Sequence, residues 1–340
     1  MNEITTIGLD LAKNVFQVHG IDETGHVLVR KRLRRGQVLG FFAGLSRCLI
    51  GMEACGTAHY WARELKALGH EVRLMPPHYV KAYVKRNKSD AADAEAFCEA
   101  VRRPTMRFVA VKSAEQQSAL MMHRARDLLV RQRTMLVNAL RGHMAEFGLV
   151  GAQGLHNVAA LITIIRNGTD ERIPEGARQV LTVVADQINE VGAKISVLEA
   201  QILAWHKSNP VSQRLATIPG IGPIIATAIA ATVPDPSVFR SGREFAAWLG
   251  LVPRQNSTGG KARLGGISKR GDSYLRRLLV NGAHAVLFWA KTSKTDPWLT
   301  SLRARKHRLV AAVALANKTA RIVWAVMSRK EIYRRTPAAA

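Results

Sequence analysis

The first hundred residues alternate between short apolar runs and longer stretches with helical periodicity. Two stretches, 58–70 and 89–103, repeat their apolar positions with the period of a helix; Gly69 fits a C-cap and Ser89 an N-cap. Five runs have the length and pattern of strands, with Gly25 in the turn between the second and third: 4–9, 14–22, 25–33, 47–54 and 71–77. This order predicts an α/β unit that starts with an antiparallel hairpin and ends near residue 112.

From residue 113 the pattern changes to two long amphipathic stretches. Residues 113–148 and 173–207 keep a 3.6-residue period over many turns, which predicts two long helices joined by a segment containing Gly and Asn. Such helices could pair within one chain as a hairpin or between two chains as a coiled coil. The pattern leaves both arrangements open.

Shorter helical periods follow from residue 208. They cover 215–233, 242–253, 272–292 and 309–330. "PGIGP" (219–223) interrupts the first and is typical of a helix-hairpin-helix turn, in which Gly220 and Gly222 would let the backbone approach a phosphate. Pro-Gly turns between helices are also common as purely structural turns. We therefore expect a multidomain α/β plus α protein with three parts: 1–112, 113–207 and 208–340.

The charge of the chain indicates its partner. The 340 residues include 50 Lys and Arg against 25 Asp and Glu, a formal charge of +25, and a hydrophobic content of 47% indicates a folded protein. This charge favours nucleic acid as the partner, with an anionic membrane surface second. The three cysteines lack disulfide or zinc spacing, no signal peptide is evident, and the most apolar run, 222–233, is too short to span a bilayer. We expect a soluble cytoplasmic protein with no membrane partner.

Four carboxylates have positions that suit a metal site. Asp10 and Glu53 end predicted strands, while Asp90 and Asp93 are three residues apart on one helical face. Together they would repel one another unless a divalent cation were bound, and oxygen ligands select Mg²⁺ or Mn²⁺. Taken singly, each acid is more often structural, for example at a helix N-terminus. A basic run beside them could line a path for a phosphate backbone or be a solvated face: Lys81, Lys85, Arg86 and Lys88.

A second candidate is a Gly-rich basic segment with one acid, Asp272. Its seven cations are Arg254, Lys261, Arg263, Lys269, Arg270, Arg276 and Arg277. A hydroxyl in such a loop suits attack on a phosphodiester, since the cations stabilise the phosphorane charge and the glycines permit close approach. The alternative is a loop that grips phosphate without chemistry.

Several of these segments resemble a known family. "IGLDLAKNVFQVHGID", "GMEACGTAHYWARELKALGHEV" and "KSDAADAEAFCEAVR" resemble the ribonuclease-H-like (RuvC-like) DEDD domain of the IS110/IS1111 family of insertion-sequence transposases, which includes Piv-type DNA invertases. "LGLVPRQNSTGGKARLGGISKRGDSYLRRLLVNGA" is similar to the family's C-terminal transposase domain. By this resemblance the family's four acids fall on Asp10, Glu53, Asp90 and Asp93.

The resemblance also implies a serine nucleophile directly before a glycine. Here Ser257 is followed by Thr258 and only then by Gly259, so the chain departs from the simplest form of the motif. We choose Ser257 because a primary hydroxyl is less hindered than a β-branched one, and Thr258 remains the alternative.

The resemblance implies a reaction and a set of partners. DNA would be cut through a 5′-phosphoserine and rejoined with the help of Mg²⁺, on donor and target DNA selected by a structured bridge RNA. The enzyme would be a tetramer, a dimer of dimers, in which the acidic domain of one subunit meets the serine loop of another. It would associate with the nucleoid when bound to DNA. Competing interpretations are a RuvC-like hydrolytic nuclease, a Piv-like invertase, an actin- or sugar-kinase-like ATPase, and a non-catalytic scaffold.

Overall fold

The computed structural model describes residues 3–83, 89–289 and 297–334. The chain divides into two compact units, each made of segments that are distant in sequence. One comprises Met1–Gln117, Ala230–Ser273 and Asn317–Arg329; the other comprises Ser118–Ile229, Tyr274–Ala316 and Lys330–Ala340. The division into three domains expected from the sequence stays a prediction.

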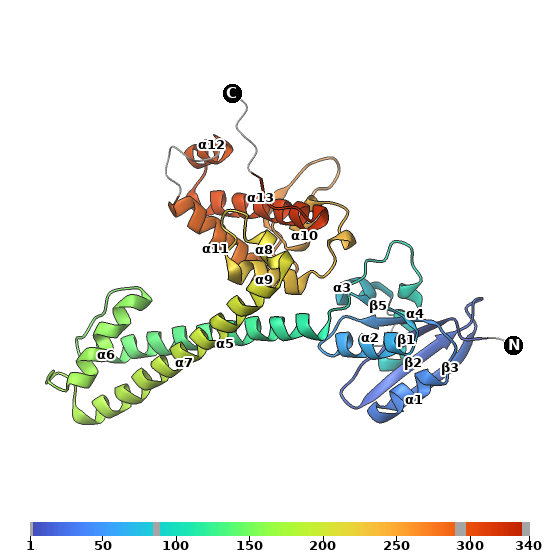
Figure 1. The fold of residues 1–340 in the computed structure, drawn as a ribbon, viewed down its shortest axis with the longest axis horizontal. Helices are drawn as coiled ribbons and strands as arrows, with labels where there is room; N and C mark the ends of the chain where they lie inside the picture. Colours follow the sequence, from blue (N-terminus) through green and yellow to red (C-terminus); the bar gives the residue numbers. More distant parts are fainter. Residues whose placement is uncertain (1–2, 84–88, 290–296, 335–340) are drawn as a thin grey trace. The chain divides into compact units, whose positions relative to one another are not determined.

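A five-stranded sheet forms the centre of the N-terminal part of the first unit (Figure 1). Its order is β3-β2-β1-β4-β5, in which β2 runs antiparallel to β1 and β3, whereas β4 runs parallel to β1 and β5. The strands are β1 (Thr6–Asp10), β2 (Val15–Ile21), β3 (Val27–Arg34), β4 (Leu49–Glu53) and β5 (Glu71–Met75). All five lie within the runs predicted from the sequence or within one residue of them, so the predicted α/β class is confirmed.

The two faces of this sheet carry different residues. On one face, the alternate positions Ile7, Leu9, Ile50 and Met52 are fully buried in a core shared with α1 and α2. The intervening positions of β1 and β4 therefore point to the other face, which α4 covers. The short helices here are η1 (Arg35–Gln37), α1 (Val38–Ala43), α2 (Ala58–Ala67), α3 (Pro77–Val80), η2 (Lys81–Tyr83) and α4 (Asp90–Val101).

Two long helices, α5 (Ala114–Ala145) and α7 (Glu175–Ser208), lie side by side (Figure 1). Val137 and Leu140 of α5 share a buried cluster with Leu181 and Ile188 of α7. The loop predicted between them contains η3 (Leu155–Asn157) and a helix, α6 (Val158–Asn167), whose apolar side closes the same cluster. The helices therefore pack within one chain, and a second pairing between chains stays a prediction.

The remainder is mainly helical. It contains α8 (Pro210–Leu215), α9 (Pro223–Thr232), η4 (Pro236–Val238), α10 (Gly242–Trp248), a hairpin of β6 (Pro253–Gln255) and β7 (Leu264–Ile267), α11 (Ser273–Trp289), α12 (Pro297–Arg305) and α13 (Arg308–Arg329). Among the described helices, α13 alone is long and apolar enough to cross a membrane, a test that a core helix also passes. Ala311 and Ala312 of α13 are fully buried against Leu287 and Leu299, so this part of α13 packs as a core helix.

Candidate active site

Two of the four predicted acids leave adjacent parallel strands at the same edge. The register between β1 and β4 pairs Leu9 with Met52, so Asp10 and Glu53 follow at the carboxyl ends of neighbouring strands. Both side chains point to the face covered by α4, because they are two residues beyond Gly8 and Gly51. Strand register thus places two carboxylates at the edge where α4 begins.

Two glycines let α4 approach this edge. A Cβ at Gly8 would lie 1.9 Å from the Ala94 carbonyl oxygen, and one at Gly51 would lie 2.7 Å from Val101 Cβ. The helix therefore rests on the bare backbone of both strands, closer than any side chain would allow. Its first turn, which begins at Asp90, is held beside the strand ends.

The first turn of α4 carries the other two acids. Ser89 caps the helix as predicted: its Oγ accepts a hydrogen bond from the Ala92 N–H at 3.3 Å. Asp90 and Asp93 occupy this first turn, where the positive end of the helix dipole stabilises negative charge. The helix cap and the helix dipole thus favour acids in the first turn of α4. The packing of α4 on the sheet brings this same turn close to Asp10.

The four carboxylates act on one another electrostatically. Burial, followed by the charges of Asp90, Asp93 and Glu53, raises the pKa of Asp10 from 3.8 to about 6. A hydrogen bond from the Leu11 backbone acts in the opposite sense. The structure therefore brings all four predicted acids into one electrostatic site.

These four carboxylates suit a hard divalent cation, because carboxylate oxygens are its preferred ligands. The positive charge of the cation would also offset the repulsion among the four acids. Within residues 3–83, 89–289 and 297–334, no three His, Cys, Asp or Glu side chains stand close enough to hold one ion as they are. Coordination would require these side chains to turn toward a common point.

The basic run beside the acids is only partly described. Lys81 lies in η2 and is exposed. Lys85, Arg86 and Lys88 lie outside the described residues. Their assignment to a nucleic-acid path stays a prediction.

The predicted serine lies on the exposed hairpin of β6 and β7. The Lys261 N–H donates to the Thr258 carbonyl at 3.1 Å, and Gly259 and Gly260 have φ of 55° and 74°. These features define a tight turn of the I′ type, which requires positive φ at both central positions and so explains the Gly-Gly pair. Ser257 directly precedes this turn and is exposed. Its Oγ accepts a hydrogen bond at 3.2 Å from the N–H of Arg263, the residue directly before β7, and this bond orients the hydroxyl.

The seven predicted cations have different environments. Arg254, Lys261 and Arg263 are exposed on the hairpin. Arg277 forms an ion pair with Asp127 and stacks its guanidinium over the Tyr274 ring. The rest lie between the hairpin and α11 or in its first turns: Lys269, Arg270 and Arg276. The hairpin thus presents three exposed cations beside Ser257.

Two glycines anchor the base of this segment, a packing role that the sequence pattern did not predict. A Cβ at Gly271 would lie 1.9 Å from the Trp248 carbonyl oxygen, and one at Gly250 would lie 2.3 Å from the Arg270 carbonyl oxygen. Gly271 and Gly250 also have φ of 72° and 70°. The chain after the hairpin therefore packs backbone to backbone against the end of α10. Glycines on both sides of the basic stretch were the available signal.

The "PGIGP" turn has a packing role at its first glycine. Gly220 has φ of 83°, and a Cβ there would lie 2.8 Å from the Gly282 carbonyl oxygen of α11. A Cβ at Gly282 would lie 2.2 Å from the Gly220 carbonyl oxygen. Gly222 has open space around it. Close packing of α11 accounts for Gly220, and phosphate binding at this turn stays a prediction.

A buried histidine forms a hydrogen-bonded network away from the acidic edge. His123 of α5 is 1% exposed, and its Nδ1 and Nε2 lie 3.0 Å from Tyr274 Oη and 2.9 Å from Thr227 Oγ1. Because Thr227 donates to the Pro223 carbonyl at 2.7 Å, Nε2 donates to Thr227 and Nδ1 accepts from Tyr274. Burial lowers the pKa of His123 to about 4. A neutral histidine therefore joins α5, α9 and α11.

Comparison with known proteins agrees with this arrangement. A family model described as "Transposase", for the DEDD domain of IS110 elements, matches residues 7–148, which include all four acids. A second, described as "Transposase IS116/IS110/IS902 family", matches residues 212–297, which include the hairpin. Both halves of the candidate site therefore lie in segments typical of these transposases.

Full-length relatives carry similar descriptions. A "Probable family 20 transposase" of Pseudomonas aeruginosa is 53% identical over 334 residues, 97% of this chain and 99% of the relative. The "Transposase for insertion sequence element IS1111A" of Coxiella burnetii is 40% identical over 336 residues, 98% of this chain and 92% of the relative. The "Transposase for insertion sequence element IS1328" of Yersinia enterocolitica is 39% identical, with coverage of 98% and 99%. The chain therefore belongs to the IS110 family of insertion-sequence transposases, enzymes that cut and rejoin DNA.

Proposed function

We propose that this transposase cuts DNA through a covalent 5′-phosphoserine on Ser257, assisted by the acids Asp10, Glu53, Asp90 and Asp93. The observation that carries the proposal is the geometry of the acidic edge: β1 and β4 place Asp10 and Glu53 at neighbouring strand ends, beside the first turn of α4 with its two acids. An arrangement of four mutually repelling acids is costly to keep without a functional cation. The exposed Ser257, oriented by Arg263, supplies a nucleophile on the other matched segment.

The reaction follows from the chemistry of these groups. Ser257 Oγ attacks the phosphorus, so an Oγ–P bond forms and the bond from phosphorus to the 3′-oxygen breaks. The hydroxyl proton passes to solvent water. The departing 3′-oxygen takes up a proton, and strand exchange follows. A 3′-hydroxyl of the new partner strand then attacks the phosphoserine and releases Ser257 without net hydrolysis.

The acidic edge would hold Mg²⁺ or Mn²⁺ through Asp10, Glu53, Asp90 and Asp93. Bound there, the cation would supply Lewis-acid stabilisation of negative charge on the phosphate. The chain's own contribution at the serine is positive charge from the hairpin. Arg254, Lys261 and Arg263 are exposed beside Ser257, where they can contact the phosphate oxygens.

The nucleic-acid partners follow from the charge and the family resemblance. We propose that the protein binds donor and target DNA together with a structured bridge RNA that selects both by base pairing. A formal charge of +25 supports a protein that contacts several phosphate backbones. The same properties favour the cytoplasm, with the nucleoid as the place of action.

The oligomer is proposed from an exposed apolar row on α5. Met121, Leu128 and Met135 recur every seven residues and are 66%, 58% and 71% exposed. On a helix this row lies opposite Val137, Leu140 and Met144, which are buried within the chain. A second apolar stripe with a seven-residue repeat is suited to a second copy of the helix. We propose that this row forms the dimer seam, and that two dimers make a tetramer.

The decisive experiment looks for covalent attachment of DNA. The protein is incubated with Mg²⁺, end-labelled donor and target DNA and the RNA from the flanking non-coding sequence, then resolved by denaturing electrophoresis. Wild type, Ser257→Ala, Thr258→Val and Asp10→Asn are compared. We expect an adduct in wild type and Thr258→Val that is lost in Ser257→Ala and Asp10→Asn. Loss in Thr258→Val alone would move the nucleophile to Thr258. Cleaved DNA without an adduct would overturn the serine mechanism and favour a hydrolytic nuclease.

A further inference from the structure

The edge strand β3 is unusually basic. Residues Arg30, Lys31, Arg32, Arg34 and Arg35 lie in or directly after it, and all five are exposed. β3 is the outermost strand of the sheet on the side of β2. Charged residues on edge strands can simply prevent pairing with other chains. The distribution of these cations between the two faces argues for a more specific role.

Strand register assigns three of the arginines to the face of the acidic edge. In the β2–β3 pairing Arg30 is opposite His19 and Arg32 is opposite Gln17, while β1 pairs Asp10 with Gln17. Asp10, Gln17 and Arg32 therefore form one row across three strands, with their side chains on the same face. Arg34, opposite Val15, shares this face because it is two residues beyond Arg32.

The other two cations lie on the opposite face and already have partners. Lys31 Nζ lies 5.5 Å from the centre of the Phe41 ring, and the Arg35 guanidinium lies 5.1 Å from that of Trp61. No carboxylate forms an ion pair with Arg30, Arg32 or Arg34 within the described parts of the chain. Three cations without a carboxylate partner therefore lie along the face that leads to Asp10.

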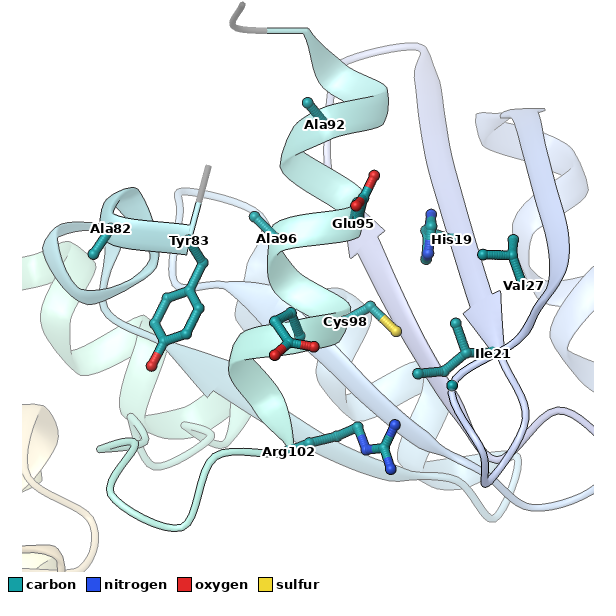
Figure 2. Close-up of a pocket in the computed structure, with 12 residues that line it drawn as sticks. His19, Ile21, Val27, Ala82, Tyr83, Ala92, Glu95, Ala96, Cys98 and Arg102 are labelled. Carbon is teal, nitrogen blue, oxygen red and sulfur yellow. The ribbon is translucent and has the colours of Figure 1, made fainter. Parts of the chain in front are cut away.

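The space beside this face restricts how a polyanion can lie on it. A groove of about 580 Å³ separates His19, Ile21 and Val27 of the sheet from α4, as Figure 2 shows. The α4 side of the groove includes Glu95, Glu99 and Arg102, and Glu99 forms an ion pair with Arg103. The α4 wall therefore carries charges of both signs, whereas the exposed cations of β3 offer positive charge to a nucleic-acid backbone on the other side.

We propose that Arg30, Arg32 and Arg34 bind successive phosphates of a DNA strand and lead that strand to the acidic edge. Alternate residues of a strand are about 6.7 Å apart, a spacing comparable to that of successive phosphates along an extended nucleic-acid strand. Two interstrand steps, together about 10 Å, separate Arg32 from Asp10 along their row. This proposal rests on the proposed function in one respect: it takes the acidic edge as the place where DNA is cut.

The test compares two pairs of substitutions that remove equal charge from opposite faces. Arg30→Gln/Arg32→Gln and the matched control Lys31→Gln/Arg35→Gln are made in the full chain carrying Ser257→Ala. Binding to a labelled single-stranded DNA, and to an RNA of the same sequence, is measured in EDTA over a range of salt concentrations. Neither metal nor chemistry is needed, so failure of the serine mechanism would leave this result interpretable. Thermal unfolding verifies that both variants are folded.

We expect Arg30→Gln/Arg32→Gln to weaken DNA binding and to lower the slope of log Kobs against log salt by about 1.4, since each single-strand phosphate contact contributes about 0.7. The control pair should leave that slope unchanged. Equal slope losses in both pairs would show that the charge acts without regard to face and would overturn the proposal. An unchanged slope in Arg30→Gln/Arg32→Gln, or a loss confined to RNA, would overturn it as well.

Discussion

Gly8 of β1 and Gly51 of β4 are register partners, and the backbone of α4 rests on both of them. Because neither residue has a side chain, α4 packs closely enough to bring Asp90 and Asp93 to the edge formed by Asp10 and Glu53. The acidic site thus depends on two residues that carry no functional group.

Replacement of Gly8 by alanine is expected to displace α4. The added Cβ would lie 1.9 Å from the Ala94 carbonyl oxygen and 2.5 Å from the Cys98 nitrogen, both backbone atoms that cannot move alone. We expect a loss of about 1–3 kcal/mol in the free energy of unfolding, typical of overpacking, measured by urea denaturation. Gly40→Ala in α1 is the control, because no atom lies within 4 Å of its Cβ position. Equal stability of the two variants would contradict the packing argument.

Asp10 makes the stability of the metal-free protein depend on pH. Its folded pKa of about 6 lies above the ordinary 3.8, so the folded state binds the proton more tightly than the unfolded state. The resulting stabilisation is complete below about pH 4 and is lost as the pH rises through 6. At pH 8, Asp10→Asn should therefore raise the free energy of unfolding by about 1–2 kcal/mol, allowing for partial exposure of the carboxylate.

The measurement is denaturation of wild type and Asp10→Asn in EDTA at pH 4 and pH 8. The difference between the two proteins should appear at pH 8 and largely vanish at pH 4. Added Mg²⁺ should stabilise wild type more than Asp10→Asn at pH 8, since the ligand binds the folded state. A constant difference at both pH values would show that Asp10 does not titrate in this range.

The base of the serine hairpin should tolerate no side chain at Gly271. A Cβ there would lie 1.9 Å from the Trp248 carbonyl oxygen, and its φ of 72° is strained for other residues. We expect Gly271→Ala to lose most DNA-joining activity, because the hairpin that carries Ser257 would be displaced. Gly266→Ala in β7 is the matched control, since its Cβ position has no atom within 4 Å. A strand-joining assay at saturating DNA compares them, and comparable activity would argue against this anchoring role.

The exposed row on α5 should control assembly. Met135→Glu places a charge in the proposed seam at a side chain that is 71% exposed, so the fold of the single chain should be unaffected. We expect the molar mass measured by light scattering to fall to that of smaller species. Thr134→Glu adds the same charge at an exposed position of α5 about 100° around the helix from Met135 and should leave the mass unchanged. An unaltered mass in Met135→Glu would place the oligomer interface elsewhere.

The sequence alone determined the elements and the chemistry they carry. Strand and helix periods place β1, β4 and α4 correctly, and the Ser89 cap is confirmed, because these features depend on neighbouring residues. The sequence also predicted the positions of the four acids, at strand ends and in a first helical turn, and it showed the excess of cations. Periodicity could not show α6 or the β6–β7 hairpin, since short elements have weak local signals.

Only the tertiary structure decided which residues meet. The ion pair of Arg277 with Asp127, the packing of Gly220 against Gly282, and the link from His123 to Tyr274 join segments that are distant in the chain. Likewise, strand register, and not composition, places Arg30, Arg32 and Arg34 on the same face as Asp10. A local pattern specifies the face that a residue takes within its own element. The partner that the residue contacts on that face depends on how elements distant in the sequence pack together, and a local pattern holds no information about that packing.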